Sequence, residues 1–325
     1  MREDVQGHLR QMEVIRGRRD FRLERSIVTL GKFDGFHKGH MKLIEKAVGS
    51  KEPGLPVVIF TFDIYPGAVL GIEASKNILT DEERNFKKIL NGVDYVYEFP
   101  FDKETISMEP EDFVRDILSG YLGMKLCIVG EDFRFGKGRR GDVQLLNKLG
   151  KELGFSVAAE KKVCIRPEGS DKEIEISSSL IKNEIEKGNL ADANNMLGRP
   201  YSIIGKVEKG KQLGGKIGFP TINFSVDSRK ILPPDGVYAT KTYVDGQVYD
   251  SITNIGIRPT FDDGDKRTVE TNIFDFDKDI YGKMAEVEFY KFIRPEKKFA
   301  SPDELLDEIN KNKISVRRYF EENKN

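Results

Sequence analysis

The feature that most constrains the fold is the alternation of strand-like and helix-like segments in the first half of the chain. β-Branched and aromatic runs cover residues 26–33, 56–62, 95–101 and 125–130, and helical spacing or helix-start signals cover 40–48, 80–90 and 111–119. Strands that alternate with helices form a parallel sheet covered by helices on both faces. We therefore expect an α/β domain with a doubly wound parallel sheet, whose ligand crevice lies beyond the carboxyl ends of the strands.

The second half of the chain has a different pattern, which begins near Gly198-Arg-Pro-Tyr201. Two strand-like runs, 237–244 and 247–252, flank Asp245-Gly246, which is a hairpin signature. Residues 269–276 and 284–292 read as further strands. This pattern predicts a mainly β domain, built as a small antiparallel barrel.

Length and helix-start signals suggest how these parts are divided. A chain of 325 residues corresponds to about two domains. We expect domains over residues 1–185 and 186–325, joined by a helical stretch near 185–199. The Ser301-Pro-Asp-Glu304 segment is a capping box with proline at the first helical position, and it predicts a final helix ending near Tyr319.

Composition excludes several classes of protein. The 53 Lys and Arg residues balance 54 Asp and Glu residues, so a general nucleic-acid or polybasic membrane binder is not expected. We find no apolar run of about 18 residues and no secretory h-region, so we expect neither a membrane span nor a signal peptide. Cys127 and Cys164 are too few for a disulfide framework, which favours a reducing cytoplasm. The sequence predicts no particular oligomeric state.

The segment Gly31-Lys-Phe-Asp-Gly-Phe-His-Lys-Gly-His40 is the densest chemical signal. It joins an expected strand to an expected helix, and its glycines allow the backbone to approach a phosphate. His37 and His40 then fall near a helix N-terminus, which favours anions. Two imidazoles there can hydrogen-bond phosphate oxygens and the charge that develops in phosphoryl chemistry. Taken in isolation, such a pair could also be an unreactive surface feature.

Ile176-Ser-Ser-Ser-Leu-Ile-Lys182 is a second candidate phosphate site. Three serines at a helix start offer hydroxyl and backbone N–H groups to a phosphate, and Lys182 follows one turn later. Lysine supplies charge but lacks the bidentate fork of arginine. An ordinary serine-rich helix cap is the alternative.

A third constellation begins at Gly205, where four glycines and four lysines occur up to Lys216. Such a loop can cradle phosphates. Thr221 and Asn223 then alternate along an expected strand, so both point to one face. A hydroxyl and an amide oxygen on one face can help to hold Mg²⁺ together with nucleotide phosphates. Without its neighbours, this pair would read as an ordinary strand edge.

The first half resembles the nucleotidylyltransferase superfamily, in the variant found in FAD synthetases. The resemblance rests on the segments 31–40, 129–142 and 176–182, and on Thr61-Phe-Asp-Ile-Tyr-Pro66, in which Ile64 and Tyr65 depart from the family pattern, as Lys182 does where arginine is usual. It implies an ATP and phosphate side formed by Gly31, Phe33, Asp34, Gly35, His37, Gly39, His40, Ser177, Ser178, Ser179 and Lys182. It implies a flavin side formed by Phe62, Tyr65, Asp132, Phe133, Arg134 and Phe135. Glycines among Arg134, Lys137, Arg139 and Arg140 suit a mobile flap over an anionic substrate.

The second half resembles the riboflavin kinases. The resemblance rests on Gly218-Phe-Pro-Thr-Ile-Asn223 with its preceding loop, and on segments 236–239, 253–261, 269–276 and 293–299. It implies that Glu270 is the base that accepts the proton of the flavin ribityl hydroxyl, and that Thr221 and Asn223 hold the metal. It implies a kinase site formed by Gly214, Lys216, Gly218, Pro220, Thr221, Asn223 and Arg294. Asn272 stands where histidine is usual.

Together the two halves follow the order of the bifunctional riboflavin kinase/FAD synthetase family, over residues 27–319. The resemblance implies an enzyme that phosphorylates riboflavin to FMN and adenylylates FMN to FAD, with ATP as co-substrate and Mg²⁺ as cofactor. Its expected partners are these small molecules; nucleic acid and membrane are not expected. Three alternatives stay open. They are the same fold with one activity, a non-catalytic flavin-binding regulator, and a nucleotidylyltransferase for another phosphate substrate.

Overall fold

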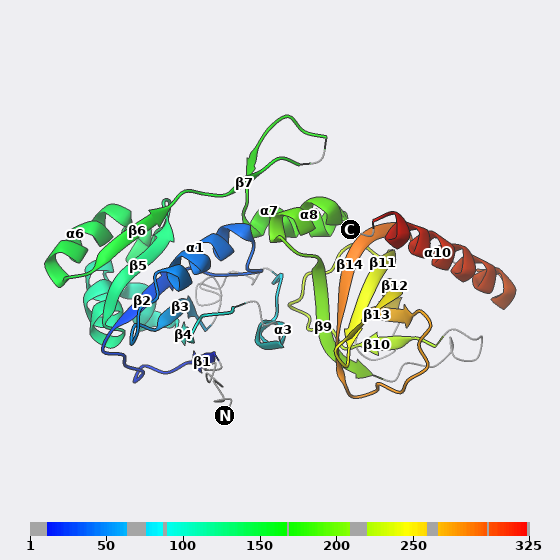
Figure 1. Cartoon of the computed structure of the whole chain (residues 1–325), viewed down its shortest axis with the longest axis horizontal. Helices are drawn as coiled ribbons and strands as arrows, with labels where there is room; N and C mark the ends of the chain where they lie inside the picture. The colour runs from blue at the N-terminus through cyan, green and yellow to red at the C-terminus, as the bar shows by residue number, and fades with distance from the viewer. Residues whose placement is uncertain are drawn as a thin grey trace, which may run out of the picture. The chain divides into compact units, whose positions relative to one another are not determined.

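The computed structural model describes residues 12–63, 76–86, 90–167, 169–208, 220–258, 266–297 and 299–323. Contacts divide the chain into two compact units (Figure 1). The first unit contains residues 1–75 and 88–164, and the second contains residues 76–87 and 165–325. Each unit is built around its own sheet, as the change of sequence pattern predicts.

The first unit is a six-stranded sheet with the order β1-β4-β3-β2-β5-β6. Every neighbouring pair is parallel, so the predicted doubly wound α/β fold is confirmed. β1 was not expected from the sequence, because it has only four residues and no alternating pattern. The strands are β1 (Glu13–Arg16), β2 (Ser26–Leu30), β3 (Val57–Phe62), β4 (Tyr95–Phe99), β5 (Met124–Gly130) and β6 (Ser156–Glu160).

Helices cover both faces of this sheet. α1 packs with Leu43, Ile44 and Ala47 toward one face. On the other face, Val28 and Phe60 belong to a core cluster shared with the later helices of the unit. The expected helix at 111–119 is present, as a short α-helix that continues as a π-helix. The helices are α1 (Lys38–Gly49), α4 (Lys103–Ser107), α5 (Pro110–Asp112), the π-helix η1 (Phe113–Tyr121), the 3₁₀-helix η2 (Lys137–Arg139) and α6 (Val143–Leu153).

The second unit contains a closed antiparallel barrel with the strand order β10-β13-β12-β11-β14-β9, which confirms the predicted architecture. Asp245 and Gly246 form the predicted hairpin turn, both with positive φ (51° and 74°). The barrel strands are β9 (Tyr201–Glu208), β10 (Ile222–Phe224), β11 (Gly236–Val244), β12 (Gln247–Arg258), β13 (Lys266–Ile273) and β14 (Met284–Arg294).

Helix α10 (Pro302–Glu322) covers part of the outer surface of the barrel. Val316 and Phe320 of this helix pack against Val237, Ala239 and Ile252. The Ser301 hydroxyl accepts a hydrogen bond from the Glu304 N–H (3.2 Å), which confirms the predicted helix start. Because side chains alternate along a strand, the outward face that carries Val237 and Ile252 also carries Asn254 and Glu270.

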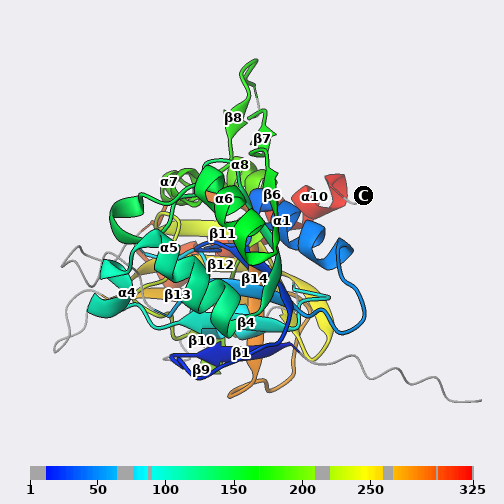
Figure 2. The same ribbon diagram turned by 90° about the vertical axis from the view of Figure 1, so that its left-hand side faces the viewer.

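The chain between the two sheets is helical near the expected join. The hairpin of β7 (Cys164–Ile165) and β8 (Ile174–Glu175) is visible in both ribbon views (Figures 1 and 2). It is followed by α7 (Ser178–Lys187) and α8 (Leu190–Leu197). Both helices belong to the second unit, so the contact division lies earlier than the expected boundary at 185/186.

A segment from the first half of the sequence belongs to the second unit. It contains α3 (Asp81–Phe86), which packs near β9. The Thr80 N–H donates to the Glu83 carboxylate (2.8 Å), and the Glu83 N–H donates to the Thr80 hydroxyl (3.3 Å), so the capping box expected here is present. No helix in the described part of the chain is long and apolar enough to cross a bilayer.

Candidate active sites

The loop after β2 lies at the point where the strand order of the first sheet reverses. β3, β4 and β1 follow on one side of β2, whereas β5 and β6 follow on the other. In sheets of this kind, the crevice at the carboxyl ends of the strands on either side of the reversal binds ligands. The loops after β2 and β5 flank this crevice, and both contain residues predicted from the sequence.

His37 and His40 lie at the start of α1. His37 is the N-cap residue, and its Nδ1 accepts a hydrogen bond from the His40 N–H (3.3 Å). The neutral His37 ring therefore carries its proton on Nε2, which can donate to a ligand. The two imidazoles stack with centroids 3.6 Å apart. A Cβ at Gly39 would lie 3.1 Å from the His37 ring, so glycine gives this ring room above the first turn.

The loop that precedes α1 is conformationally strained. Phe33 and Phe36 have positive φ (49° and 42°), which is uncommon for bulky residues, and Gly35 has a φ of 86°. Both phenylalanines are almost fully buried, and Asp34 is also buried. Packing of the two rings thus holds a backbone conformation that costs free energy, a feature that clusters at functional sites. Phe33 contacts His40 (ring centroids 5.1 Å apart).

The loop after β5 contains the predicted flavin-side residues 132–135. Phe133 and Phe135 stack with centroids 5.7 Å apart, but Phe135 is buried in the core, whereas Phe133 is only partly buried. Two backbone hydrogen bonds between Phe135 and Gly141 (3.1 and 2.9 Å) close the segment into a tight turn. The movement of this segment as a flap over a substrate stays a prediction.

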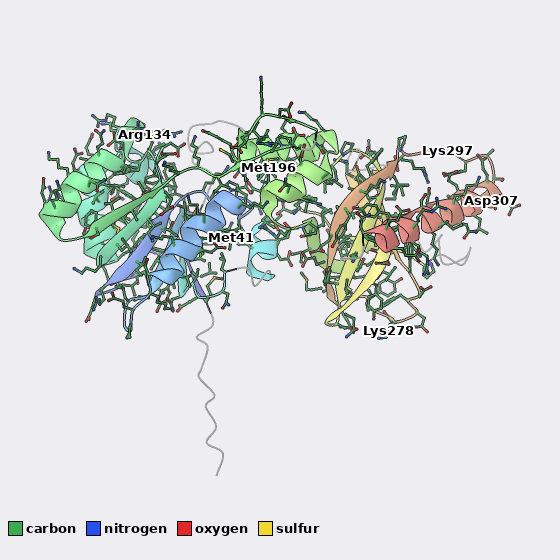
Figure 3. All side chains as sticks on the ribbon, turned by 45° about the horizontal axis from the view of Figure 1, so that its top comes forward. Met41, Arg134, Met196, Lys278, Lys297 and Asp307 are labelled. Atoms are coloured by element: carbon green, nitrogen blue, oxygen red, sulfur yellow. The ribbon has the colours of Figure 1, made fainter. Side chains whose placement is uncertain are left out.

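Carboxylates bind most of the basic side chains in this turn. Arg134, labelled in Figure 3, pairs with Asp142 (2.8 Å). The pKa of Asp142 is lowered, first by the hydrogen bond that its carboxylate accepts from the Leu145 N–H as N-cap of α6, and then by Arg134. Lys137 and Arg140 both pair with Glu109. Asp132 pairs with Lys162 (3.0 Å).

The remaining residues predicted for the first site are divided between the units. Phe62 ends β3 and packs on Phe101 (ring centroids 4.5 Å apart). Tyr65 lies outside the described residues. Ser177, whose hydroxyl accepts from the Leu180 N–H (3.2 Å), caps α7 in the second unit, where Ser178, Ser179 and Lys182 follow.

Two of the kinase residues predicted from the sequence, Asn223 and Glu270, lie side by side on the outer face of the barrel. Asn223 of β10 lies directly opposite Glu270 of β13, and Glu270 lies directly opposite Asn254 of β12. Directly opposite residues of antiparallel strands share a face, with Cβ atoms about 4.5–5.5 Å apart. The row therefore brings one carboxylate between two amides. Thr221, two residues before Asn223, is half-buried and lies directly before β10.

Asn272 shapes the backbone beside this row. Its Nδ2 donates to the Pro220 carbonyl oxygen (2.8 Å), directly before Thr221, and the side chain is 8% exposed. Asparagine at this position therefore holds the start of β10 in place. The predicted loop residues Gly214, Lys216 and Gly218 lie outside the described part of the chain.

Arg294 ends β14 next to α10. Its Nε donates to Asn312 Oδ1 (3.3 Å) and lies 3.2 Å from Glu308 Oε1. Arg294 lies directly opposite Val237 of β11. Val237 in turn lies opposite Asn254, so Arg294 is in line with the row of Asn223, Glu270 and Asn254. The guanidinium is thus held by two residues of α10.

The donor atoms of this site fit Mg²⁺. Hydroxyl and amide oxygens of Thr221 and Asn223 are the hard oxygen ligands that this ion prefers. Among the described residues, no group of three His, Cys, Asp or Glu side chains is arranged to hold a metal.

Comparisons with known proteins identify the family of both halves of the chain. The FAD synthetase family model matches residues 20–179, and the riboflavin kinase family model matches residues 197–320. The bifunctional riboflavin kinase/FMN adenylyltransferase of Bacillus subtilis (strain 168) is 35% identical over 91% of this chain and 93% of its own length. The protein of the same name from Escherichia coli (strain K12) is 36% identical over the same shares. The chain belongs to the bifunctional riboflavin kinase/FMN adenylyltransferase family.

A solved structure shares this fold over nearly the whole chain. It is described as a macrolide-efflux protein from Streptococcus pneumoniae, and it matches with a TM-score of 0.81 and 30% identity. The match covers 94% of this chain and 98% of that one. The two-unit architecture is therefore found in an experimental structure as well.

Sequence reasoning missed two features of the riboflavin kinase half. The first is Asn254, which lies within a segment that resembles the family. Only the strand register, which places it opposite Glu270, shows that it belongs to the candidate site. The contribution of residues 76–87 to the second unit could not be read from local pattern, because Glu83 and its partner Lys230 are 147 residues apart.

Proposed function

We propose that this protein converts riboflavin to FMN and FMN to FAD, each step at a separate site and each at the expense of ATP. The observation that supports this most strongly is the presence of two separate polar constellations in one chain. One is the histidine pair at the start of α1, and the other is the row of Asn223, Glu270 and Asn254. Family membership supports the same reading.

In the kinase step, the Glu270 carboxylate accepts the proton of the terminal ribityl hydroxyl. The hydroxyl oxygen attacks the γ-phosphorus of ATP, the bond to the β-phosphate oxygen breaks, and ADP leaves. Thr221 and Asn223 would hold Mg²⁺, which neutralises phosphate charge when bound. Pro220, Arg294 and the loop residues Gly214, Lys216 and Gly218 complete the proposed nucleotide and flavin contacts. General-base catalysis is expected to supply part of the rate, and positioning the rest.

In the adenylyltransferase step, a phosphate oxygen of FMN attacks the α-phosphorus of ATP, and pyrophosphate leaves. The attacking group is already an anion, so no base is needed. His37 and His40, with the N-terminus of α1, stabilise the charge on the phosphates. We assign the same side to Gly31, Phe33, Asp34, Gly35, Gly39, Ser177, Ser178, Ser179 and Lys182.

The flavin side of this step is proposed to include Phe62, Tyr65, Asp132, Phe133 and Arg134. Phe133 is the better candidate for ring contact, because Phe135 is buried in the core. Phe135 would then support Phe133 by stacking. We assign the adenylyltransferase residues to 1–185 and the kinase residues to 186–325, with residues 76–87 as a structural part of the second unit.

A cytoplasmic location is part of this proposal. Cys127 is a buried free thiol and Cys164 an exposed one, which suits a reducing compartment. The proposed partners are riboflavin, FMN and ATP. The departures at Lys182 and Asn272 do not favour loss of one activity, since Lys182 keeps the positive charge and Asn272 anchors the Pro220 carbonyl.

The test is chromatography of the products formed by the purified chain with ATP and Mg²⁺, fed first with riboflavin and then with FMN. FAD with transient FMN from riboflavin is the expected result. FMN without FAD would refute the adenylyltransferase half of the proposal. FAD from FMN but no product from riboflavin would refute the kinase half.

A further inference from the structure

Asn254 is the closest cross-strand neighbour of Glu270 on the side away from Asn223. The two residues are directly paired in the register of β12 and β13. Asn254 is half-buried, so its amide is accessible from the same face as the Glu270 carboxylate. An amide at this position can reach either the carboxylate or a substrate hydroxyl bound to it.

The orientation of the Asn254 amide is set by a carboxylate. Asn254 Nδ2 donates to Glu296 Oε1 (3.1 Å). An ionised carboxylate only accepts hydrogen bonds, so the NH₂ group must face Glu296. The orientation of the amide oxygen and of the second N–H is then fixed relative to a substrate that binds beside Glu270.

Gly256 gives Glu296 its place over β12. A Cβ at Gly256 would overlap the Glu296 carboxylate. Gly256 lies two residues beyond Asn254 and therefore on the same face of the strand. The carboxylate thus rests above the backbone of β12 within reach of the Asn254 amide.

Contacts on both sides of Glu296 fix its backbone to α10. Arg294 contacts Asn312 and Glu308, and Asn312 is only 5% exposed. Lys297 Nζ lies 3.4 Å from Oε1 of Glu304, a residue of α10. Figure 3 labels Lys297 and Asp307, and Asp307 is another residue of this helix. Each exposed ion pair contributes little free energy alone. Together with Pro295, which restricts the backbone between them, they hold the backbone of Glu296 beside α10, while its side chain stays exposed.

We propose that Glu296 and Asn254 are positioning residues for the riboflavin kinase reaction. Glu296 orients the Asn254 amide, and the amide aligns the ribityl hydroxyl against the Glu270 carboxylate. Helix α10 supports this arrangement through Arg294 and Lys297. The inference rests on the proposed role of Glu270 in the kinase step. It adds two residues to that step and leaves the adenylyltransferase step untouched.

The decisive experiment compares four test variants and one control variant of the full chain in steady-state riboflavin phosphorylation. Glu296→Ala removes the acceptor, Glu296→Lys replaces it with a donor that would turn the Asn254 amide around, and Glu296→Gln keeps an acceptor oxygen. Gly256→Ala displaces the carboxylate without changing a polar group. Asp307→Asn, an exposed acid on α10, is the charge-matched control.

We expect kcat to fall about 10- to 100-fold for Glu296→Ala, Glu296→Lys and Gly256→Ala, because misplacement of about 1 Å has effects of this size. Glu296→Gln should recover most of the loss, the KM for ATP should stay within about 3-fold, and Asp307→Asn should match the wild type. FAD formation from supplied FMN should be unchanged in all of them.

Two results would overturn the inference. One is a kcat within about 2-fold of the wild type for Glu296→Ala and Glu296→Lys. The other is an equal loss in both reactions, which would indicate general destabilisation. A wild-type chain that forms no FMN from riboflavin would instead refute the proposed kinase function itself, and with it this inference.

Discussion

Lys230 Nζ lies 2.7 Å from Glu83 Oε2, and both side chains are almost completely buried. The ammonium group also donates to the carbonyl oxygens of Ile78 and Ser202 (2.7 Å each), so all three of its donors are used. The other Glu83 oxygen accepts from the Ile204 N–H (2.9 Å). Within the described residues, β10 pairs with β9 only at Val207 and Glu208. The ion pair therefore satisfies backbone groups of β9 on the edge that β10 does not reach, opposite the edge that pairs with β14.

Lys230→Met is expected to destabilise the second unit by about 3–5 kcal/mol, because it leaves the buried Glu83 carboxylate without its counterion. Glu83→Gln should also destabilise it, and the double variant should lose less than the sum of the two single changes. The free energy of unfolding of the second unit is measured by urea titration, with the loss of kinase activity as the readout.

An exposed pair of the same kind provides the control for this prediction. Lys283 and Asp245 are 2.6 Å apart with about half of each side chain exposed (48% and 47%). Lys283→Met should change the free energy of unfolding by less than about 1 kcal/mol. Equal effects of the two lysine substitutions would show that the buried pair has no special role in closing the barrel.

The Glu83–Lys230 pair also marks the limit of what the sequence predicts about the fold. Local signals gave the parallel sheet, the hairpin turn at Asp245 and the capping boxes at Thr80 and Ser301, because turn and cap chemistry acts over a few residues. The capping box at Thr80 does not indicate that Glu83 is also the counterion of Lys230, which lies far away in the sequence. Such a pairing depends on tertiary packing, which a local pattern does not encode.

The two cysteines should differ strongly in reactivity. Burial raises the pKa of the Cys127 thiol to about 12, whereas Cys164 is exposed. A raised pKa leaves only about one Cys127 in 10⁴ as the reactive thiolate at pH 8. We expect one thiol per chain to react with a disulfide reagent under native conditions, and two in urea. In Cys164→Ser no thiol should react until the protein unfolds; rapid native labelling of this variant would contradict the burial of Cys127.

His37 is expected to have two separable roles, in capping α1 and in binding phosphate. His37→Ala removes the acceptor for the His40 N–H and should cost about 1 kcal/mol of stability in the first unit. His37→Asn restores a capping acceptor but not the imidazole. FAD formation from FMN should fall about 10²- to 10³-fold in both variants, whereas only the alanine variant should unfold more easily.

Riboflavin phosphorylation is the built-in control for the His37 variants, since it uses the other site and should keep its wild-type rate. Full recovery of FAD formation in His37→Asn would mean that His37 acts only as a helix cap. Differential scanning calorimetry supplies the stability comparison in the same samples.

The candidate sites were predictable from sequence to different extents. Local spacing was enough for His37 and His40, because a strand, a glycine-rich turn and a helix fix their position. The buried state of Phe135 could not be predicted, since alternation within a loop does not say which ring faces the core. Asn254 escaped notice because its place beside Glu270 depends on the register between β12 and β13, which the local sequence pattern does not give.

Glu270→Gln should abolish most riboflavin phosphorylation while leaving FAD formation from FMN intact. The substitution keeps the size and hydrogen-bonding capacity of the side chain but removes its ability to accept a proton. The expected loss in kcat is about 10²- to 10⁴-fold, the usual range for a general base. The KM for ATP should change little, since Asn223, the neighbouring residue in the row, keeps its own place in β10. Unchanged FMN formation would show that the hydroxyl is deprotonated elsewhere, whereas a parallel loss of FAD formation from FMN would point to misfolding of the chain.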